Sequence, residues 1–416
     1  MAPGSSASTQ RIVWTLTICT ALSLAGDATL YAVLPSQHAA LGLAALQVGW
    51  LLSINRLARI PLNAFSGWLS NRVGFRGPYI VGMLCGALST VGYGLTPSYG
   101  LLLALRALWG LSWALLTVAA FGMILDAAAP DERGRYTGVY SSFSFFGGAI
   151  LAILGGVWVD SLGYATAMRL LGAITALGLL LSLTLPPRRA RPVAVSTCSR
   201  AVRVARWSQR LGLGDPQILL ILVMNFFHRL FFAGVFYATF GAYLATTLGQ
   251  YPRVGGHTLG IASLTAGLLF LRNVVSILVG PLLGALSDRL GQRVGLIALG
   301  FGLGAAGLGL LALPHTWPTL AIAVLASAVA YGLVPPLMVA RIGDLTQGQR
   351  GGAISGYQIA GDLGSGLGPL AAYALIEAFG MSTTYGLSGA LLFGLVILAL
   401  VGLRQRSWSR NVPLDT

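Results

Sequence analysis

"SGWLSNRVGFR" at residues 66–76 has a near copy, "LGALSDRLGQR", at residues 283–293. Both are polar breaks between long apolar runs in a chain that is 56% hydrophobic. The offset between them, 217 residues from 66 to 283, also aligns further residues without a gap: Pro97 with Pro314, Arg133 with Arg350, Tyr140 with Tyr357, Asp160 with Glu377 and Gly163 with Gly380. One register that holds over so long a stretch predicts two homologous halves.

The composition of the 416-residue chain is that of a membrane protein. Its mean hydropathy is +0.78 and 9% of its residues are charged, whereas a soluble domain carries about 25% charged residues. A helix needs roughly 20 apolar residues to span a bilayer. The sequence contains twelve such segments, at residues 11–34, 43–70, 78–95, 99–127, 137–160, 166–186, 217–247, 258–286, 294–312, 317–343, 353–378 and 383–403. Because they are continuously apolar, they do not fit the strands of a β-barrel. We expect an all-α membrane protein with twelve transmembrane helices in two parallel six-helix pseudo-repeats.

The basic residues predict the orientation of these helices. All 26 are arginines, and the net charge is +15. They gather on alternate breaks between the apolar segments, which indicates cytoplasmic turns, cytoplasmic termini and a plasma (inner) membrane location rather than a nucleic-acid partner. The expected organisation is a tail, a six-helix bundle, an Arg-rich linker, a second six-helix bundle and a second tail, at residues 1–10, 11–186, 187–216, 217–403 and 404–416.

The two turns and the twelve segments together resemble the major facilitator superfamily, which has a signature between transmembrane helices 2 and 3. The matching residues are Gly67, Asn71, Arg72, Gly74 and Arg76 in the first copy and Gly284, Asp288, Arg289, Gly291 and Arg293 in the second. "RALWGLS" at residues 106–112 is similar to the helix 4 motif of the family, with Arg106 and Gly110 in place. The chain resembles bacterial or archaeal drug/solute:proton transporters of this superfamily, which implies transport through a site between the two halves.

The resemblance implies that each turn is a latch on the cytoplasmic face. Asn71 stands where family members have an aspartate, so the first turn keeps a hydrogen-bonding side chain and loses a charge. We therefore expect a weaker latch, and an outward-facing state that is less favoured than usual. Asp126 and Asp344 end helices 4 and 10 on the cytoplasmic side, and we expect them to join the turns.

Ionisable residues inside apolar segments are candidates for function, because a charge in the bilayer costs free energy. With a rise of about 1.5 Å per residue, Asp27 lies about 24 Å and Arg56 about 22 Å from the cytoplasmic end of their segments, and the two side chains are able to meet. Arg106 lies still nearer the outside, and Arg59 is one turn inward of Arg56. The sequence predicts a buried cluster of these residues, which serves either coupling or substrate contact, or is a permanent ion pair that fixes helix packing.

A second cluster is expected in the C-terminal half. Asp362 lies about 15 Å and Arg272 about 24 Å from the cytoplasmic end, and His228 and Arg229 are near the midplane. We expect Asp362 to pair with Arg229 or Arg272. Histidine changes charge near neutral pH, so His228 is a candidate proton carrier, although a lone histidine in a helix is more often a hydrogen-bonded packing residue.

Aromatic residues are the candidates for the wall of a substrate cavity. The favoured set, together with Arg59, is Tyr31, Trp113, Phe232, Phe236 and Tyr237. Most aromatic residues in such helices pack against neighbours or face lipid, so only part of this set is expected to touch a substrate. An aromatic cavity favours amphipathic compounds over highly charged ones.

These features predict a secondary transporter that works by alternating access, with proton-coupled efflux of amphipathic compounds as the preferred function. The alternatives are an importer or uniporter of an organic anion, bound by arginines, and a non-transporting sensor on the same fold. The expected partners are the lipid bilayer, a small-molecule substrate and protons, and the chain is expected to be a monomer.

An enzyme is the disfavoured class. The four histidines, His38, His228, His257 and His315, are scattered and do not form a nucleophile–base or metal cluster. A phosphate-binding loop of the Gly-x4-Gly-Lys type is excluded because the chain has no lysine. The cysteines, Cys19, Cys85 and Cys198, show no metal or disulfide spacing. We therefore expect no cofactor and no metal.

Overall fold

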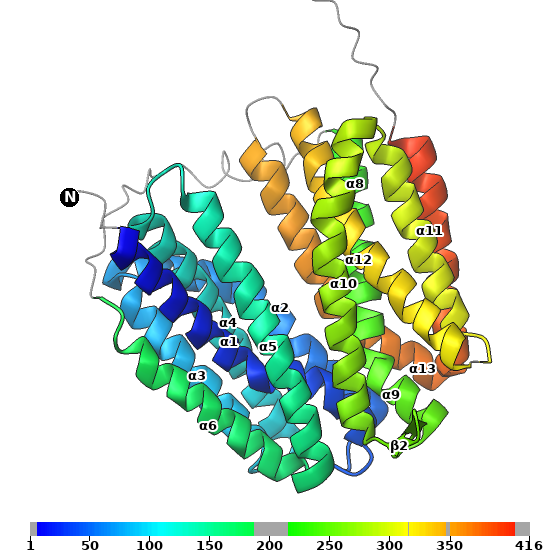
Figure 1. Cartoon of the computed structure of the whole chain (residues 1–416), viewed down its shortest axis with the longest axis horizontal. Coiled ribbons are helices and arrows are strands. Elements are labelled where there is room, and N and C mark those ends of the chain that lie inside the picture. The colour runs from blue at the N-terminus through cyan, green and yellow to red at the C-terminus, as the bar shows by residue number, and fades with distance from the viewer. Residues whose placement is uncertain (1–5, 187–214, 315, 347–349, 404–416) are drawn as a thin grey trace, which may run out of the picture. The chain divides into compact units, whose positions relative to one another are not determined.

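The structure is a computed structural model that describes residues 6–186, 215–314, 316–346 and 350–403 (Figure 1). The predicted C-terminal tail and nearly all of the predicted linker, including Cys198, lie outside the described residues, as does His315. The side chains of Asp288 and Arg350 also lie outside the description.

Helices form almost all of the described chain. The first half contains α1 (Ser6–Gln37), α2 (Ala45–Val73), α3 (Arg76–Tyr93), α4 (Tyr99–Ala127), α5 (Arg133–Leu162) and α6 (Tyr164–Ser182). The second half contains α8 (Pro216–Arg229), the π-helix η1 (Leu230–Phe236), α9 (Tyr237–Leu248), α10 (Ile261–Leu290), α11 (Arg293–Leu311), α12 (Trp317–Leu345) and α13 (Arg350–Gly402). A short antiparallel hairpin of β1 (Arg253–Val254) and β2 (His257–Thr258) connects α9 to α10.

Nine helices within the described ranges are long and apolar enough to cross a membrane. One of the nine is the continuous segment of α8, η1 and α9. Neither α3 nor α2 is among the nine, and α2 carries three arginines. The set also counts α13 once, although the backbone at Gly380 (φ 81°, ψ 168°) divides α13 into two helices. The all-α membrane fold is therefore confirmed, and the helices are consistent with the twelve predicted spans.

The internal repeat of the sequence returns as a repeat of the backbone. Gly74 and Gly291 occupy equivalent places in the two turns and have φ angles of 84° and 65°. Gly163 and Gly380, a second aligned pair, have φ angles of 80° and 81°. Glycine adopts these angles without steric cost, whereas other residues do not. One helix therefore ends and the next begins at the same aligned positions in both halves.

The described residues group into two compact units. Among them, unit 1 comprises residues 6–186, 226–274 and 358–384. Unit 2 comprises the described residues within 215–225, 275–357 and 385–403. Parts of the second half of the chain, namely η1, α9, the start of α10 and the middle of α13, thus pack with α1 to α6. The division into two bundles at the linker stays a prediction.

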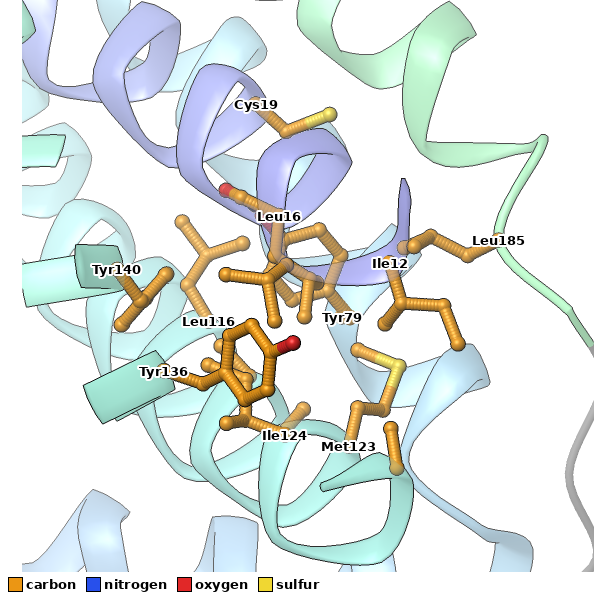
Figure 2. Close-up of a cluster of buried hydrophobic side chains, with 14 of the residues drawn as sticks. Ile12, Leu16, Cys19, Tyr79, Leu116, Met123, Ile124, Tyr136, Tyr140 and Leu185 are labelled. Carbon is orange, nitrogen blue, oxygen red and sulfur yellow. Dashed lines mark hydrogen bonds between the residues drawn. The ribbon is translucent and has the colours of Figure 1, made fainter. Parts of the chain in front are cut away.

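The interior of unit 1 is built around α1, which packs against α5 and α6. Figure 2 shows a buried cluster to which α1 contributes Leu16, α3 contributes Tyr79 and α4 contributes Ile124. The Tyr79 hydroxyl donates to the Leu16 carbonyl at 3.1 Å and lies 2.9 Å from the Thr20 hydroxyl, so this polar group is satisfied inside the apolar interior. Cys19 is buried in the same cluster, as a packing residue.

In unit 2, small residues allow α10, α11 and α12 to approach one another closely. A side-chain carbon added at Gly307 of α11 would lie 3.0 Å from the Ala323 carbonyl oxygen of α12. Ser276 of α10 donates its hydroxyl to the Ala328 carbonyl of α12 at 2.8 Å. Contacts of this kind hold transmembrane helices together, because lipid tails remove the hydrophobic driving force between them.

Candidate functional site

Asp27 of α1 and Arg106 of α4 form a buried ion pair in unit 1. Arg106 Nη1 lies 2.5 Å from Asp27 Oδ1, and Arg106 Nε donates to the Leu51 carbonyl of α2 at 2.8 Å. Only 1% of the Arg106 side chain and 16% of the Asp27 side chain are exposed. Gly110 allows α4 to approach α2, because a side-chain carbon there would lie 2.6 Å from the Asn55 carbonyl oxygen. The pair thus ties three helices together by charge-assisted hydrogen bonds.

Tyr31 and Asn55 extend this ion pair into a network. Asn55 Nδ2 donates to Asp27 Oδ1 at 3.4 Å, and Arg56 Nε donates to the Tyr31 hydroxyl at 2.9 Å. The guanidinium carbons of Arg56 and Arg106 lie 5.2 and 5.4 Å from the centroid of the Tyr31 ring. Both distances are in the range of cation–π attraction, so one tyrosine orients two arginines.

The expected cluster of Asp27, Arg56 and Arg106 is present, but its pairing differs from the predicted meeting of Asp27 with Arg56. The Asp27 carboxylate contacts Arg106 and Asn55, and Arg56 is hydrogen-bonded to Tyr31. Asn55 and Arg56 are consecutive on α2, so their side chains point about 100° apart, and it is Asn55 that faces the acid. Depth alone does not show this rotation. Asn55 was missed because a neutral amide gives no charge signal in an apolar segment.

The second acid, Asp362 of α13, pairs with Arg59 of α2. Arg59 Nη2 lies 3.4 Å from Asp362 Oδ1, and 17% of the Arg59 side chain and 33% of the Asp362 side chain are exposed. This corrects the expectation that Asp362 pairs with Arg229 or Arg272. The candidate site therefore joins α2 of the first half to α13 of the second, within unit 1.

Close packing of α13 on α2 explains this partner. A side-chain carbon at Gly366 would lie 2.8 Å from Leu57 Cδ2, and one at Gly49 would lie 3.1 Å from the Pro369 carbonyl oxygen. The Leu370 N–H donates to the Ser53 hydroxyl of α2 at 3.2 Å. The face of α13 that carries Gly366 and Pro369 is thus turned to α2, and it brings Asp362 to Arg59.

The π-helix η1 sets the surroundings of Arg272. Arg272 Nη2 donates to the Phe232 carbonyl at 3.4 Å, and the guanidinium carbon lies 4.9 Å from the centroid of the Phe236 ring. A π-turn alters the intrahelical hydrogen-bond pattern and often occurs at functional sites. Arg272 is buried by these contacts, and His228 is buried with its ring centroid 5.0 Å from that of Phe232. The structure thus brings Arg272, His228 and two of the predicted aromatic residues together around η1.

The remaining aromatic candidates lie in different surroundings. The Tyr237 ring lies 5.3 Å from the Tyr31 ring, so it belongs to the Arg56 network. Trp113 of α4 lies between Trp109 and Phe145, with ring centroids 6.4 and 5.8 Å away. Phe232 and Phe236 are fully buried and thus pack in this conformation, whereas Tyr237, Trp113 and the cation Arg229 are partly exposed.

The first polar turn is held by its arginines. The Arg72 guanidinium lies 4.4 Å from the centroid of the Trp68 ring, and Arg76 donates to the Leu183 carbonyl at 2.8 Å. Asn71 is exposed, and so is Asp126 at the end of α4. A side-chain carbon at Gly67 would meet no described atom within 4 Å, so the helix has open space at this position.

The second polar turn includes an acid from another helix. Arg293 forms an ion pair with Asp344 of α12 and donates to the Ala340 carbonyl at 3.4 Å. Arg289 is exposed at the end of α10, and Gly284 has open space around it among the described atoms. The Asp288 side chain lies outside the described residues. The turn is thus connected to α12 through Arg293 and Asp344, as the sequence suggested for Asp344.

Comparison with known proteins decides the family. The family model described as Major Facilitator Superfamily matches residues 16–271 and 221–413. The chain belongs to the major facilitator superfamily. This superfamily member is accordingly a multi-pass membrane protein.

Curated relatives of this superfamily chain include an amine transporter and a vesicular acetylcholine transporter. The chromaffin granule amine transporter of Rattus norvegicus is 27% identical over 266 residues, which cover 62% of the chain and 47% of that protein. The vesicular acetylcholine transporter unc-17 of Caenorhabditis elegans is 34% identical over 113 residues, 27% of the chain and 21% of that protein. The chain therefore spans about half or less of the length of these relatives.

Solved structures of transporters share the fold of this chain. The nucleoside transporter NupG superposes with a TM-score of 0.70 at 14% identity, over 95% of the chain and 100% of that chain. A bacterial homolog to the human lysosomal transporter Spinster, in an inward-facing and unoccupied conformation, gives a TM-score of 0.68 at 17% identity, over 96% of both chains. At these identities the likeness establishes the fold alone.

Proposed function

We propose that this superfamily member is a proton-coupled secondary transporter that exports amphipathic organic compounds by alternating access. The observation that carries the proposal is that two membrane-depth carboxylates, one from α1 and one from α13, contact α2 one helical turn apart. Asp27 contacts α2 through Asn55, and Asp362 contacts α2 through Arg59. A movement between α2 and α13 therefore changes the surroundings of Asp362 directly.

The two carboxylates are suited to different tasks. Asp27 is held at 2.5 Å by an arginine that is itself buried, and protonation of this acid would leave the guanidinium buried without its counter-ion. Asp362 is more exposed and meets Arg59 at 3.4 Å, so a proton reaches it without breaking a close pair. We assign proton binding to Asp362, and the positioning of α1, α2 and α4 to the Asp27–Arg106 pair.

Protonation of Asp362 links the proton to the movement of helices. The neutral carboxylic acid no longer attracts the Arg59 guanidinium, so the link between α2 and α13 weakens. In the proposed cycle Asp362 takes up a proton from the outside and releases it to the cytoplasm, while the substrate moves outward. A substrate that binds the ionised carboxylate competes with both the proton and Arg59, which is the requirement for exchange.

The substrate class follows from the aromatic residues and from the relatives. Tyr31 and Tyr237 provide aromatic surface next to the charged network. The names of the relatives refer to amines and acetylcholine, which are small organic cations. An organic cation with an apolar or aromatic part would place its ammonium group beside Asp362, where Arg59 now lies, and its apolar part against these rings.

An organic anion is the second candidate substrate, for an importer or uniporter. Arg59 and Arg106 pair with the two carboxylates, and Arg56 is hydrogen-bonded to Tyr31, so these five charged side chains carry one more positive than negative charge. An organic carboxylate would complete the charge balance through bidentate contact with Arg56 or Arg59.

The proposed location is the plasma (inner) membrane, with both termini in the cytoplasm. The support is the gathering of arginines on alternate turns of the sequence, a pattern that is typical of cytoplasmic turns. Antibody or protease access to a tag at either terminus, in intact cells and in inverted vesicles, tests this orientation.

Transport by the purified chain in liposomes tests the function. A fluorescent lipophilic cation and a fluorescent lipophilic carboxylate of similar size serve as probes, each with and without an imposed pH gradient. We expect the gradient to drive the cation, and Asp362→Asn to abolish this dependence. Glu377→Gln is the matched control, because Glu377 is an exposed acid on the same helix.

The outcomes of this assay are distinct. Movement of the carboxylate probe without a gradient would favour the anion uniporter. Indifference of both probes to the gradient, together with unchanged transport in a variant that combines Asp27→Asn and Asp362→Asn, would refute proton coupling.

A further inference from the structure

Asp160 at the C-terminal end of α5 is bound to the first turn of α10. Its Oδ2 atom accepts hydrogen bonds from the Ser263 backbone N–H at 2.8 Å and from the Ser263 hydroxyl at 2.5 Å. Its Oδ1 atom accepts a third from the Ala262 N–H at 3.3 Å. The first N–H groups of a helix have no partner within the helix and lie at the positive end of its dipole. A carboxylate from the first half of the chain therefore caps a helix of the second half, within unit 1.

The backbone around this carboxylate is shaped for close contact. A side-chain carbon at Gly260 would overlap the Asp160 carboxylate, and one at Gly156 would lie 2.8 Å from the Ala262 carbonyl oxygen. Glycines thus stand on both sides of the contact, one on α5 and one just before α10. Asp160 is on the side of the helices opposite the Arg-rich turns, which places the contact at the predicted outer end.

Among the described residues, the equivalent contact of the internal repeat is not formed. The offset of 217 residues places Asp160 on Glu377, and the start of α10 on the start of α2. Glu377 is exposed, and the start of α2 uses its own Gln47, whose Oε1 accepts from the Ala44 N–H at 2.9 Å. The start of α10 is thus capped by a charged side chain from the other half of the chain, whereas the repeat-related start of α2 is capped by a neutral side chain of its own helix.

We infer that Asp160 is a positioning residue for transport: its bonds to α10 hold the outer end of α5 against α10 in this conformation and break when that end opens. The inference rests on the alternating access proposed above. Breaking them removes three hydrogen bonds from an ionised group and leaves two N–H groups of α10 to water. At the same end, Gln250 Nε2 donates to the Ser36 carbonyl at 3.4 Å, a neutral and longer contact. Asp160 therefore sets a large part of the free energy difference between the closed and open outer end.

A distance measurement across the contact tests this role. Spin labels at Leu162→Cys and His257→Cys, both exposed positions, report the separation of the end of α5 from the hairpin before α10 in a background without the native cysteines. We expect Asp160→Asn to raise the ratio of open to closed molecules by roughly tenfold, the size expected for hydrogen bonds to a charged group. Gly260→Ala keeps the acid but occupies its place, so it should give the same shift. Glu377→Gln, the repeat-related control, should leave the distances unchanged.

Asp160→Asn and Gly260→Ala also allow a double-mutant cycle. Because both act by removing the same cap, their combination should shift the distances no further than either alone. If Asp160→Asn proves poorly folded, Gly260→Ala decides. Wild-type distances in a folded Asp160→Asn or Gly260→Ala protein, or an equal shift in Glu377→Gln, would overturn the inference. A shift of the distances in both variants, while neither transport probe follows the pH gradient, would support the role of the Asp160 contact with α10 and refute the proton coupling proposed above.

Discussion

The two acid–arginine pairs of unit 1 differ in how firmly they are held. Asp27 and Arg106 meet at 2.5 Å with the arginine almost completely buried, whereas Asp362 and Arg59 meet at 3.4 Å with both side chains partly exposed. The first pair joins helices of one half of the chain, and the second joins the two halves. Buried pairs are costly to break and exposed pairs contribute little stability. The difference supports the proposal that the first pair stabilises the fold and that the second changes during transport.

The largest effect on transport is expected for Asp362→Asn. The amide cannot bind and release a proton, so transport driven by a pH gradient should fall by at least about tenfold. The unfolding temperature in detergent should stay close to that of the wild type, because a partly exposed pair contributes less stability than a buried one. Gradient-driven transport in liposomes and a thermal melt measure the two quantities. Full gradient-driven transport in the folded variant would contradict the assignment of proton binding to the Asp362–Arg59 pair.

Stability should separate the two arginines. Arg106→Ala leaves Asp27 without its main partner inside the helix bundle and should lower the free energy of unfolding by about 3–5 kcal/mol. Arg59→Ala should lower it by less than about 1 kcal/mol. Denaturant unfolding in mixed micelles compares the two variants directly. Equal losses in the two variants would show that both pairs, or neither, stabilise the fold.

The close approach of α4 to α2 should matter less than the ion pair itself. Gly110→Ala places a carbon near the Asn55 carbonyl and should cost about 1–3 kcal/mol, the usual range for overpacking. Gly100→Ala on the same helix is the matched control, because a carbon there meets no described atom within 4 Å. The same denaturant assay applies. If Gly100→Ala loses as much stability as Gly110→Ala, close packing of α4 on α2 does not explain the loss.

The smallest effect is expected at the first polar turn, where the same contrast between a firm and a loose contact recurs. Arg293 of the second turn is paired with Asp344, whereas Asn71 of the first is exposed and neutral. Asn71→Asp should favour the outward-facing state severalfold, a change of about 1 kcal/mol or less for an exposed charge. Distances between labels on the cytoplasmic face provide the measure. An unchanged ratio of inward-facing to outward-facing molecules would show that the missing charge does not weaken the latch.

Most of the fold could be predicted from the sequence, because it follows from local properties. Apolar length locates the spans, and the glycines of the repeat, Gly74 with Gly291 and Gly163 with Gly380, mark positions where helices end. These features need no knowledge of how distant helices meet. The depth of Asp27, Arg56 and Arg106 likewise follows from counting residues along each helix, and the structure gathers them as expected.

The partners within the site could not be predicted, because they depend on the rotation of each helix about its axis. Asp362 meets Arg59 because Gly366 and Pro369 turn one face of α13 toward α2. The π-helix places Phe232 and Phe236 around Arg272 through a backbone irregularity that hydrophobic periodicity does not show. Counting residues along each helix therefore identifies which charged side chains lie at membrane depth, and tertiary packing decides which of them pair.

Infrared difference spectroscopy during a pH step tests the central claim most directly, since it detects the protonated carboxyl group without requiring a known substrate. The wild-type chain, Asp362→Asn and Asp27→Asn are compared in lipid, with Glu377→Gln as the control. The account predicts a protonated-carboxyl band that is lost in Asp362→Asn and kept in Asp27→Asn and in the control. A band that survives in Asp362→Asn and disappears in Asp27→Asn would contradict it.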